Sequence, residues 1–226
     1  MVIKLSKKDR DWINIQYPDL KINSKSISGN FNFNRAYRGY DISDSYKLDI
    51  KLNIDEGHHI PKVSIATDKI KNIAQKHNIT REDLHLNDDD TLCLTIKSLE
   101  HEYFENSFTI QEFLKNCVEN YLYWVSYYNE VGFPPWAEYA HGKLGYIELF
   151  SESKISTNTL LLELGKDFLV FRKISLDRKC LCGKDTKLKT CHPLIYNGIE
   201  KIQNLHFLKL SNTMLNYNLW KIIHNE

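Results

Sequence analysis

Strict alternation of apolar and polar residues over residues 46–54 is the feature that most constrains the fold. Its apolar members are Tyr46, Leu48, Ile50, Leu52 and Ile54. Because successive side chains of a strand point to opposite faces, the pattern predicts a strand with one face on a core and the other in water. Residues 27–33 alternate in the same way, and residues 58–65 form a third candidate after the turn at 55–57. The first 65 residues therefore predict a meander of antiparallel strands.

Helical spacing of apolar residues marks two later segments. Residues 68–77 predict a helix with Asp68 as its N-cap, and residues 110–130 predict a longer helix with a wide apolar face. Thr109 and Glu112 have the spacing of a capping box, and the Gly- and Pro-containing residues 132–136 end the pattern. Before the strands, residues 11–20 are consistent with either a short helix or an irregular lead-in.

The order of these segments predicts an α+β fold, with flanking helices beside an antiparallel sheet. Residues 151–159 are polar, with Ser, Thr, Lys and Asn and few apolar residues, and they indicate a connector. We therefore expect one domain over residues 1–150 and a C-terminal region over residues 151–226, which contains a small zinc module at residues 180–192.

Composition excludes several classes of function. The 226 residues include 30 basic and 29 acidic side chains, a formal charge of +1, so no strong field favours nucleic acid or a membrane as partner. The N-terminus lacks the apolar core of a signal peptide, and no apolar run has the length of a membrane span. An odd number of cysteines, five, in such a chain indicates a reducing compartment, and we expect a cytoplasmic protein.

Four potential metal ligands lie within residues 180–192: Cys180, Cys182, Cys191 and His192. Three thiolates and one imidazole suit a tetrahedral Zn²⁺ ion, and a full set of four protein ligands is typical of a structural site. The alternative is a set of unrelated reduced cysteines, which the dense spacing disfavours. The segment resembles the SEC-C motif, a short zinc-binding element, in its Cys-x-Cys-Gly, basic spacer and Cys-His. Leu181, Lys184 and Asp185 stand where that family has Pro and Gly-Ser.

The second notable cysteine is Cys93, which lies between Leu92 and Leu94 after the acidic run at 88–90. The acidic run predicts a turn, and residues 92–96 predict the start of a short, partly buried strand. A thiol at such a boundary can be accessible to a reaction partner while the adjoining structure fixes its backbone. A buried cysteine that only fills space would give the same pattern.

The region around Cys93 resembles the ubiquitin-conjugating enzymes, in which a strand meander precedes His-Pro-Asn, a short loop and a catalytic Cys. It is similar to divergent bacterial members from anti-phage operons that also encode cGAS-like nucleotidyltransferases. The segment Asp-Thr-Leu-Cys-Leu at 90–94, the aromatic helix at 121–130 and the Gly-Phe-Pro-Pro-Trp at 132–136 carry this resemblance. It spans roughly residues 10–140.

The resemblance implies that Cys93 accepts a protein C-terminus as a thioester and passes it to an amine. It makes Asn87 the residue that supports the active-site loop and stabilises the oxyanion, and His85 a structural histidine. The implied partners are an activating enzyme and either a ubiquitin-like protein or a cGAS-like nucleotidyltransferase. Leu86 replaces the usual Pro, and the spacing from His85 to Cys93 is two residues shorter than in the eukaryotic enzymes.

Two other functions remain open at this stage. The chain could be a non-catalytic interaction scaffold, in which the zinc module docks a partner. It could also be a cysteine hydrolase that pairs Cys93 with His85 or His101, although no hydrolase signature accompanies these residues.

Overall fold

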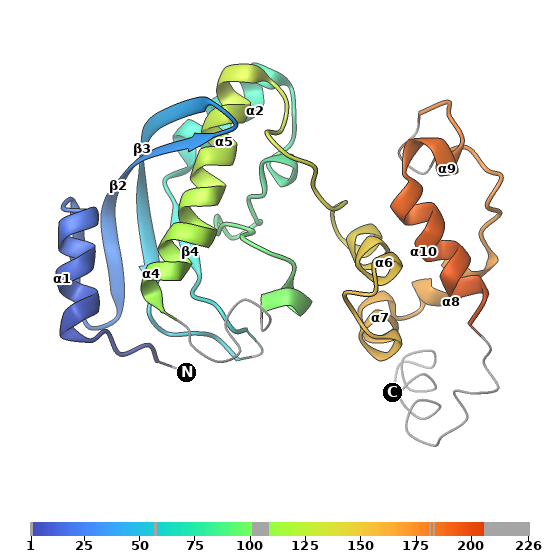
Figure 1. Ribbon diagram of the computed structural model, residues 1–226, viewed down its shortest axis with the longest axis horizontal. Helices are drawn as coiled ribbons and strands as arrows, with labels where there is room; N and C mark the ends of the chain where they lie inside the picture. The colour runs from blue at the N-terminus through green and yellow to red at the C-terminus, as the bar shows by residue number, and fades with distance from the viewer. Residues whose placement is uncertain (1, 57, 101–108, 181, 183, 206–226) are drawn as a thin grey trace. The chain divides into compact units, whose positions relative to one another are not determined.

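A computed structural model describes residues 2–56, 58–100, 109–180, 182 and 184–205, and it divides the chain into two compact units (Figure 1). The first unit is Met1–Ala137 and the second is Glu138–Glu226. This division falls earlier in the chain than the boundary at residue 150. Across the described ranges, no helix is both long enough and apolar enough to cross a membrane.

A four-stranded antiparallel sheet forms the centre of the first unit. Its strands lie in chain order: β1 (Leu20–Ile22), β2 (Ser26–Tyr37), β3 (Tyr40–Lys51) and β4 (Val63–Ile65). The α+β class and the antiparallel meander predicted from the alternation are therefore confirmed.

The β2–β3 hairpin is longer than the alternation predicts. The two strands pair from Ser26↔Lys51 to Tyr37↔Tyr40, and a two-residue turn of Arg38 and Gly39 joins them. Both turn residues have positive φ, 50° and 81°, the backbone that matches the twist of a tight hairpin. Glycine adopts this conformation without steric cost, which explains its place at the second turn position.

The third predicted strand is shorter than expected. Of residues 58–65, only β4 at Val63–Ile65 pairs with β3, through Leu48↔Ile65 and Ile50↔Val63. Pro61 has no backbone N–H to donate to a neighbouring strand, which limits pairing before β4. The strand predicted at 46–54 ends at Lys51, although Leu52 and Ile54 stay buried beyond it.

The first unit has three main helical segments, of which the last two match the sequence expectations in type, while the first resolves the alternative left open before the strands. They are α1 (Lys7–Gln16), α2 (Thr67–His77) and a continuous helix made of α4 (Ile110–Glu112), the π-helical η3 (Phe113–Val118) and α5 (Glu119–Val131). Thr109 caps the last of these by accepting the backbone N–H of Glu112 at 3.2 Å. Asp68 is not the N-cap of α2, because the helix begins one residue earlier and Ala66 occupies that position.

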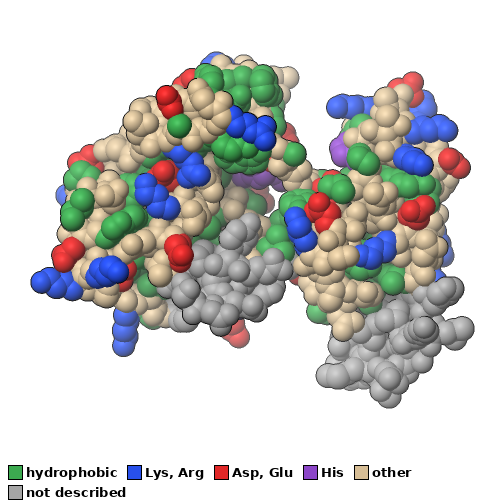
Figure 2. Space-filling model, viewed as in Figure 1, with side chains coloured by type: hydrophobic (Ala, Val, Ile, Leu, Met, Phe, Trp, Pro, Cys, Tyr) green, Lys and Arg blue, Asp and Glu red, His purple; other side chains and the backbone are tan. Residues whose placement is uncertain are grey.

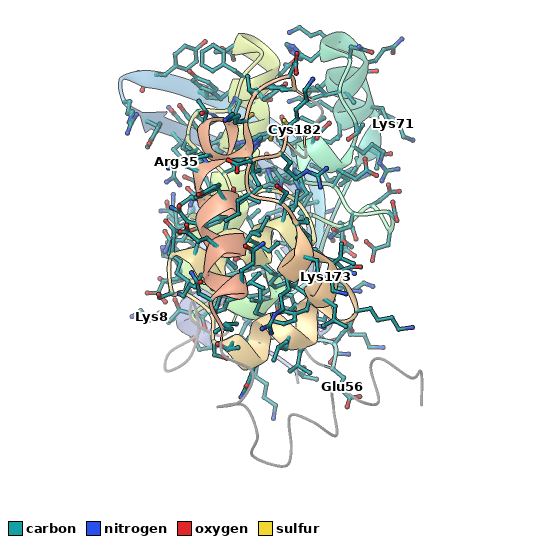
Figure 3. All side chains as sticks on the ribbon, turned by 90° about the vertical axis from the view of Figure 1, so that its right-hand side faces the viewer. Lys8, Arg35, Glu56, Lys71, Lys173 and Cys182 are labelled. Carbon is teal, nitrogen blue, oxygen red and sulfur yellow. The ribbon has the colours of Figure 1, made fainter. Side chains whose placement is uncertain are left out.

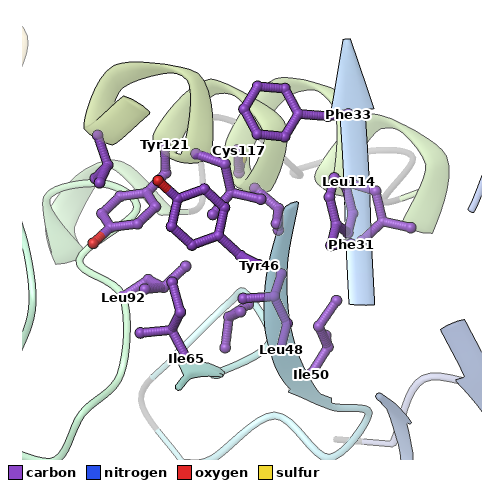
Figure 4. Packing of buried hydrophobic residues seen from close by; sticks show 14 of the residues in the cluster. Phe31, Phe33, Tyr46, Leu48, Ile50, Ile65, Leu92, Leu114, Cys117 and Tyr121 are labelled. Carbon is purple, nitrogen blue, oxygen red and sulfur yellow. The ribbon is translucent and has the colours of Figure 1, made fainter. Parts of the chain in front are cut away.

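The helix of η3 and α5 covers one face of the sheet and closes the hydrophobic core (Figure 4). Alternate residues of β2 and β3 face this helix, as the alternation predicts. The buried side chains that meet there include Phe31, Tyr46, Leu48, Ile50, Leu114, Cys117 and Tyr121. Cys117, on the apolar face of this helix, is 6% exposed.

The second unit is helical where it is described. Its helices are α6 (Lys143–Ser151), α7 (Thr157–Leu164), α8 (Asp167–Lys173), α9 (Leu188–Cys191) and α10 (Pro193–Gln203). The predicted connector at 151–159 contains the end of α6 and the start of α7.

Candidate functional site

The four potential metal ligands come together in the second unit. One ligand atom from each of Cys180, Cys182, Cys191 and His192 lies within 4.8 Å of all the others, so the cluster could hold a metal ion. The backbone N–H of Cys180 donates to the carbonyl of Thr186 at 2.8 Å, which brings Cys180 back to the segment that precedes α9. Cys191 ends α9 and His192 joins it to α10, while Figure 3 labels Cys182 on the preceding loop.

Distances within the cluster fit a tetrahedral ion with a small adjustment. The sulfur atoms of Cys182 and Cys191 are 3.7 Å apart, close to the roughly 3.8 Å expected for two thiolates bound at about 2.3 Å from zinc. The sulfur of Cys180 and Nδ1 of His192 are 3.0 Å apart, a hydrogen-bond separation that must widen to admit an ion. The donor chemistry therefore suits zinc, and the identity of the metal is a proposal.

Two of these thiols have opposite pKa shifts. Burial raises the pKa of Cys180, whereas the backbone N–H of Lys184 lowers the pKa of Cys182. Since a metal binds thiolates, Cys182 is the thiol from which a proton leaves more readily.

Cys93 lies in the first unit, on a segment that two backbone hydrogen bonds attach to its surroundings. The N–H of Leu92 donates to the carbonyl of Val63 in β4 at 2.8 Å, and the N–H of Cys93 donates to the carbonyl of His85 at 2.8 Å. The strand predicted at 92–96 does not form, because Leu92 alone of these residues makes a bridge, an isolated one to Leu86, while the bridge to Ser64 comes from Thr91 before the segment. The thiol of Cys93 is half-buried, and its described contact is the carbonyl of Thr95 at 4.0 Å.

Asn87 belongs to a closed turn beside this segment. Its backbone N–H donates to the carbonyl of Thr91 at 2.9 Å, and its side-chain amide donates to the Thr91 hydroxyl at 3.0 Å. Asp90 completes the turn with a positive φ of 59°. The Asn87 side chain is thus directed across the turn to Thr91.

The acidic side chains of the same turn are engaged locally. Asp89 accepts hydrogen bonds from Thr91, which lower the pKa of Asp89, and it lies 3.6 Å from the ammonium of Lys62. Asp90 pairs with Arg81, which also donates to the carbonyl of Asn87 at 3.1 Å. These partners account for the placement of both aspartates. No sequence pattern pointed to Thr91 or Arg81 as part of this turn.

His85 is held against the long helix. Its ring meets the ring of Trp124 edge-on, with centroids 5.1 Å apart, and its backbone adopts a positive φ of 55°. The hydroxyl of Tyr121 donates to the neighbouring carbonyl of Leu84 at 2.9 Å, in the 3-10 turn η1 (Glu82–Leu84). His85 therefore contacts Cys93 through its backbone carbonyl, while its ring packs on α5.

Cys117 and His101 complete the cysteines and histidines of the first unit that bear on catalysis. Cys117 is buried in the core, and burial raises its pKa to about 11. His101, the second histidine considered for a hydrolase, lies outside the described residues.

The fold and these two sites define an α+β protein with an antiparallel sheet, a partly reachable cysteine loop and a Cys-His cluster that could hold a metal. Comparisons with protein-family models, curated proteins and solved structures gave no match to the chain. Its function is therefore argued from the sites themselves.

Proposed function

We propose that the first unit is a ubiquitin-conjugating-like transferase that carries a protein C-terminus as a thioester on Cys93. The observation that carries the proposal is a half-buried thiol whose backbone is tied to β4 through Leu92 and to the carbonyl of His85. Such a thiol can meet a partner while its position stays fixed, as a covalent carrier requires.

The order of elements supports this assignment. Along the chain come a helix, a four-strand antiparallel meander, the helix α2, the loop from His85 to Cys93 and a long helix across the sheet. Apart from α2, this order resembles that of the ubiquitin-conjugating enzymes, and by this resemblance Cys93 would correspond to their catalytic cysteine. By the same resemblance, the protein would act in bacterial anti-phage defence.

The proposed reaction has two acyl transfers. The Cys93 thiolate attacks the carbonyl carbon of a C-terminus held as a thioester on an activating enzyme; a new C–S bond forms and the activating enzyme leaves as a thiolate. A target amine then attacks the Cys93 thioester, a C–N bond replaces the C–S bond, and Cys93 leaves as a thiolate. The amine proton passes to that thiolate or to water.

Asn87 and His85 would support this chemistry indirectly. The hydrogen bonds between Asn87 and Thr91 hold the turn that precedes Cys93, consistent with a loop-supporting role. Oxyanion stabilisation by Asn87 would require its amide to leave Thr91 during the reaction. His85 keeps the carbonyl that accepts the Cys93 N–H in place by packing on Trp124.

The experiment combines the purified chain with ATP, an activating enzyme and the ubiquitin-like proteins or nucleotidyltransferases encoded beside its gene. We expect a covalent adduct that thiol reductants release, and in Cys93→Ser an oxyester that resists them. Cys117→Ser is the matched control, because that thiol is buried, and it should keep the adduct. If wild type forms no reducible adduct with any of these partners, the proposal is wrong.

A non-catalytic scaffold is the second candidate, and an aromatic surface on the first unit favours it. Two groups of aromatic rings lie where the β2–β3 hairpin turns and α5 ends: Tyr37 contacts Trp136, and Tyr127 contacts Tyr40 and Phe133. The ring of Tyr123 joins the two groups, and Phe133 is 57% exposed. Figure 2 shows hydrophobic side chains gathered at this end of the unit. The scaffold requires Cys93→Ala to keep biological activity while Cys180→Ala loses it.

A further inference from the structure

A buried carboxylate on α6 lies close to the metal cluster without being one of its ligands. Glu148 is 6% exposed, and its Oε2 accepts the backbone N–H of Ala140 at 2.5 Å. This contact directs the side chain back towards the N-terminal end of α6, as side chains on a helix normally point.

Helices α6 and α10 pack closely and run in the same direction. A Cβ added at Gly198 would lie 2.4 Å from the carbonyl oxygen of Ile147, so only glycine allows this approach. Further along both helices, the ammonium of Lys201 donates to the carbonyl of Phe150 at 2.8 Å and to the hydroxyl of Ser153 at 3.0 Å.

This register brings the start of α10 to the start of α6. His192 precedes α10 by one residue, six positions before Gly198, and therefore lies near the segment before α6 where the Glu148 carboxylate is held. The Glu148 carboxylate and the His192 ring are therefore close enough to interact electrostatically.

The two ring nitrogens of His192 have different roles in this arrangement. Nδ1 faces the thiol of Cys180 at 3.0 Å and is the nitrogen that would bind the ion. Nε2 is then free to carry the proton. Metal-bound histidines usually donate this second N–H to a carboxylate or carbonyl, which fixes the orientation of the ring.

We propose that Glu148 is the positioning residue of the metal cluster: its carboxylate accepts a hydrogen bond from Nε2–H of His192, so that the bound ion fastens α10 to α6. The metal then stabilises the helical packing of the second unit and not only the loop at residues 180–192. This inference stands apart from the chemistry of Cys93.

Zinc affinity of the full chain tests the inference, measured by competition with a chromophoric chelator. Loss of an outer carboxylate of this kind typically weakens metal binding about 10- to 100-fold. We expect the loss of zinc affinity in Glu148→Gln to lie near the lower end of this range, because an amide oxygen still accepts a hydrogen bond. Glu148→Ala should lose more zinc affinity. Glu163→Gln, a half-buried glutamate on α7, is the matched control and should bind zinc as wild type does.

Two further measurements separate positioning from a purely structural role. In a His192→Ala background, Glu148→Gln should cause no additional loss of zinc affinity, because its partner is gone. The rise in melting temperature on zinc addition should also shrink in Glu148→Gln. Equal destabilisation with and without zinc, an additive loss in the His192→Ala background, or no zinc binding by wild type would each overturn the proposal.

Discussion

Cys93 and Cys117 differ in burial, which affects both access to a thiol and its protonation. Cys117 lies in the core under the long helix with a pKa raised to about 11, so it stays protonated at neutral pH. Cys93 is half-buried on a segment at the edge of the same core. Because the thiolate is the nucleophile, the core cysteine is protected by both burial and protonation.

Alkylation of the zinc-loaded native protein should therefore modify Cys93 and leave Cys117 unmodified. Brief treatment with iodoacetamide at pH 7.5 followed by peptide mass spectrometry measures the two sites separately. Cys93→Ser should abolish the fast reaction, and Cys117→Ser should leave it unchanged. Modification of Cys117 at the same rate as Cys93 would contradict the burial argument.

At the scale of elements, the carboxylate of Asp44 connects the sheet to two helices through hydrogen bonds. Asp44 on β3 accepts hydrogen bonds from Lys69 on α2 and from Ser126 on α5, the latter at 2.7 Å. Tyr46 on β3 shares the Ser126 hydroxyl at 2.8 Å, and the Lys69 ammonium lies 3.9 Å from the Tyr46 ring centroid. Burial alone would raise the pKa of Asp44, but these hydrogen bonds lower it overall.

Asp44→Asn should reduce the free energy of unfolding by about 1–3 kcal/mol at pH 7, the range for removing a charged hydrogen-bond partner. A carboxylate with a lowered pKa in the folded state stabilises the protein above the unfolded-state pKa of 3.8 and loses that effect as pH falls further. The difference in free energy of unfolding between wild type and Asp44→Asn should thus stay constant from pH 7 to 5 and decrease below pH 3.8. Urea titrations across this range measure it, with the exposed Asp41→Asn as control; a gap independent of pH would contradict the charge argument.

The sequence predicts the types of these elements better than their ends. Alternation finds β2 and β3 because each has a buried face, but it stops short at Asn34–Tyr37, where exposed Asn34 and Ala36 flank half-buried Arg35 and Tyr37. The apolar run at 92–96 predicts a strand, yet strand formation depends on a partner, and among the described residues only Leu86 bridges to it, through Leu92. Local pattern carries no information about such distant pairing.

The candidate sites were predictable to the extent that their residues are close in sequence. The spacing from Cys180 to His192 identified a cluster whose ligand atoms do lie together. Asn87 was placed by resemblance, but its bond to Thr91 depends on the geometry of the turn. The proposed contact of Glu148 with His192 depends on the packing of α6 on α10, which no local motif encodes.

At the scale of the whole molecule, the two units depend on different forces. The first unit has a large apolar core between sheet and helix. The second consists of short helices, and its Cys-His cluster links the loop after Lys179 to the start of α10. Metal binding that requires the folded arrangement of ligands adds directly to folding stability.

Removal of the metal with a chelator should therefore destabilise residues 138–205 selectively. We expect a lower melting temperature for one of two thermal transitions and faster limited proteolysis within the second unit, with peptides of the first unit unchanged. Readdition of zinc should restore both, and Cys93→Ser, which keeps all four ligands, should respond as wild type does. Identical behaviour of the second unit with and without metal would show that the cluster has no structural role.

The hydrogen bond from the Cys93 N–H to the carbonyl of His85 also has a consequence for hydrogen–deuterium exchange. The amides of Leu92 and Cys93 are both donors in backbone hydrogen bonds, so they should exchange slowly although the Cys93 side chain is partly open to solvent. A group attached to this sulfur would be bound to a residue whose backbone N–H is already hydrogen-bonded. Its attachment would then require little ordering of the backbone, and slow exchange at residues 92–93 should persist after modification.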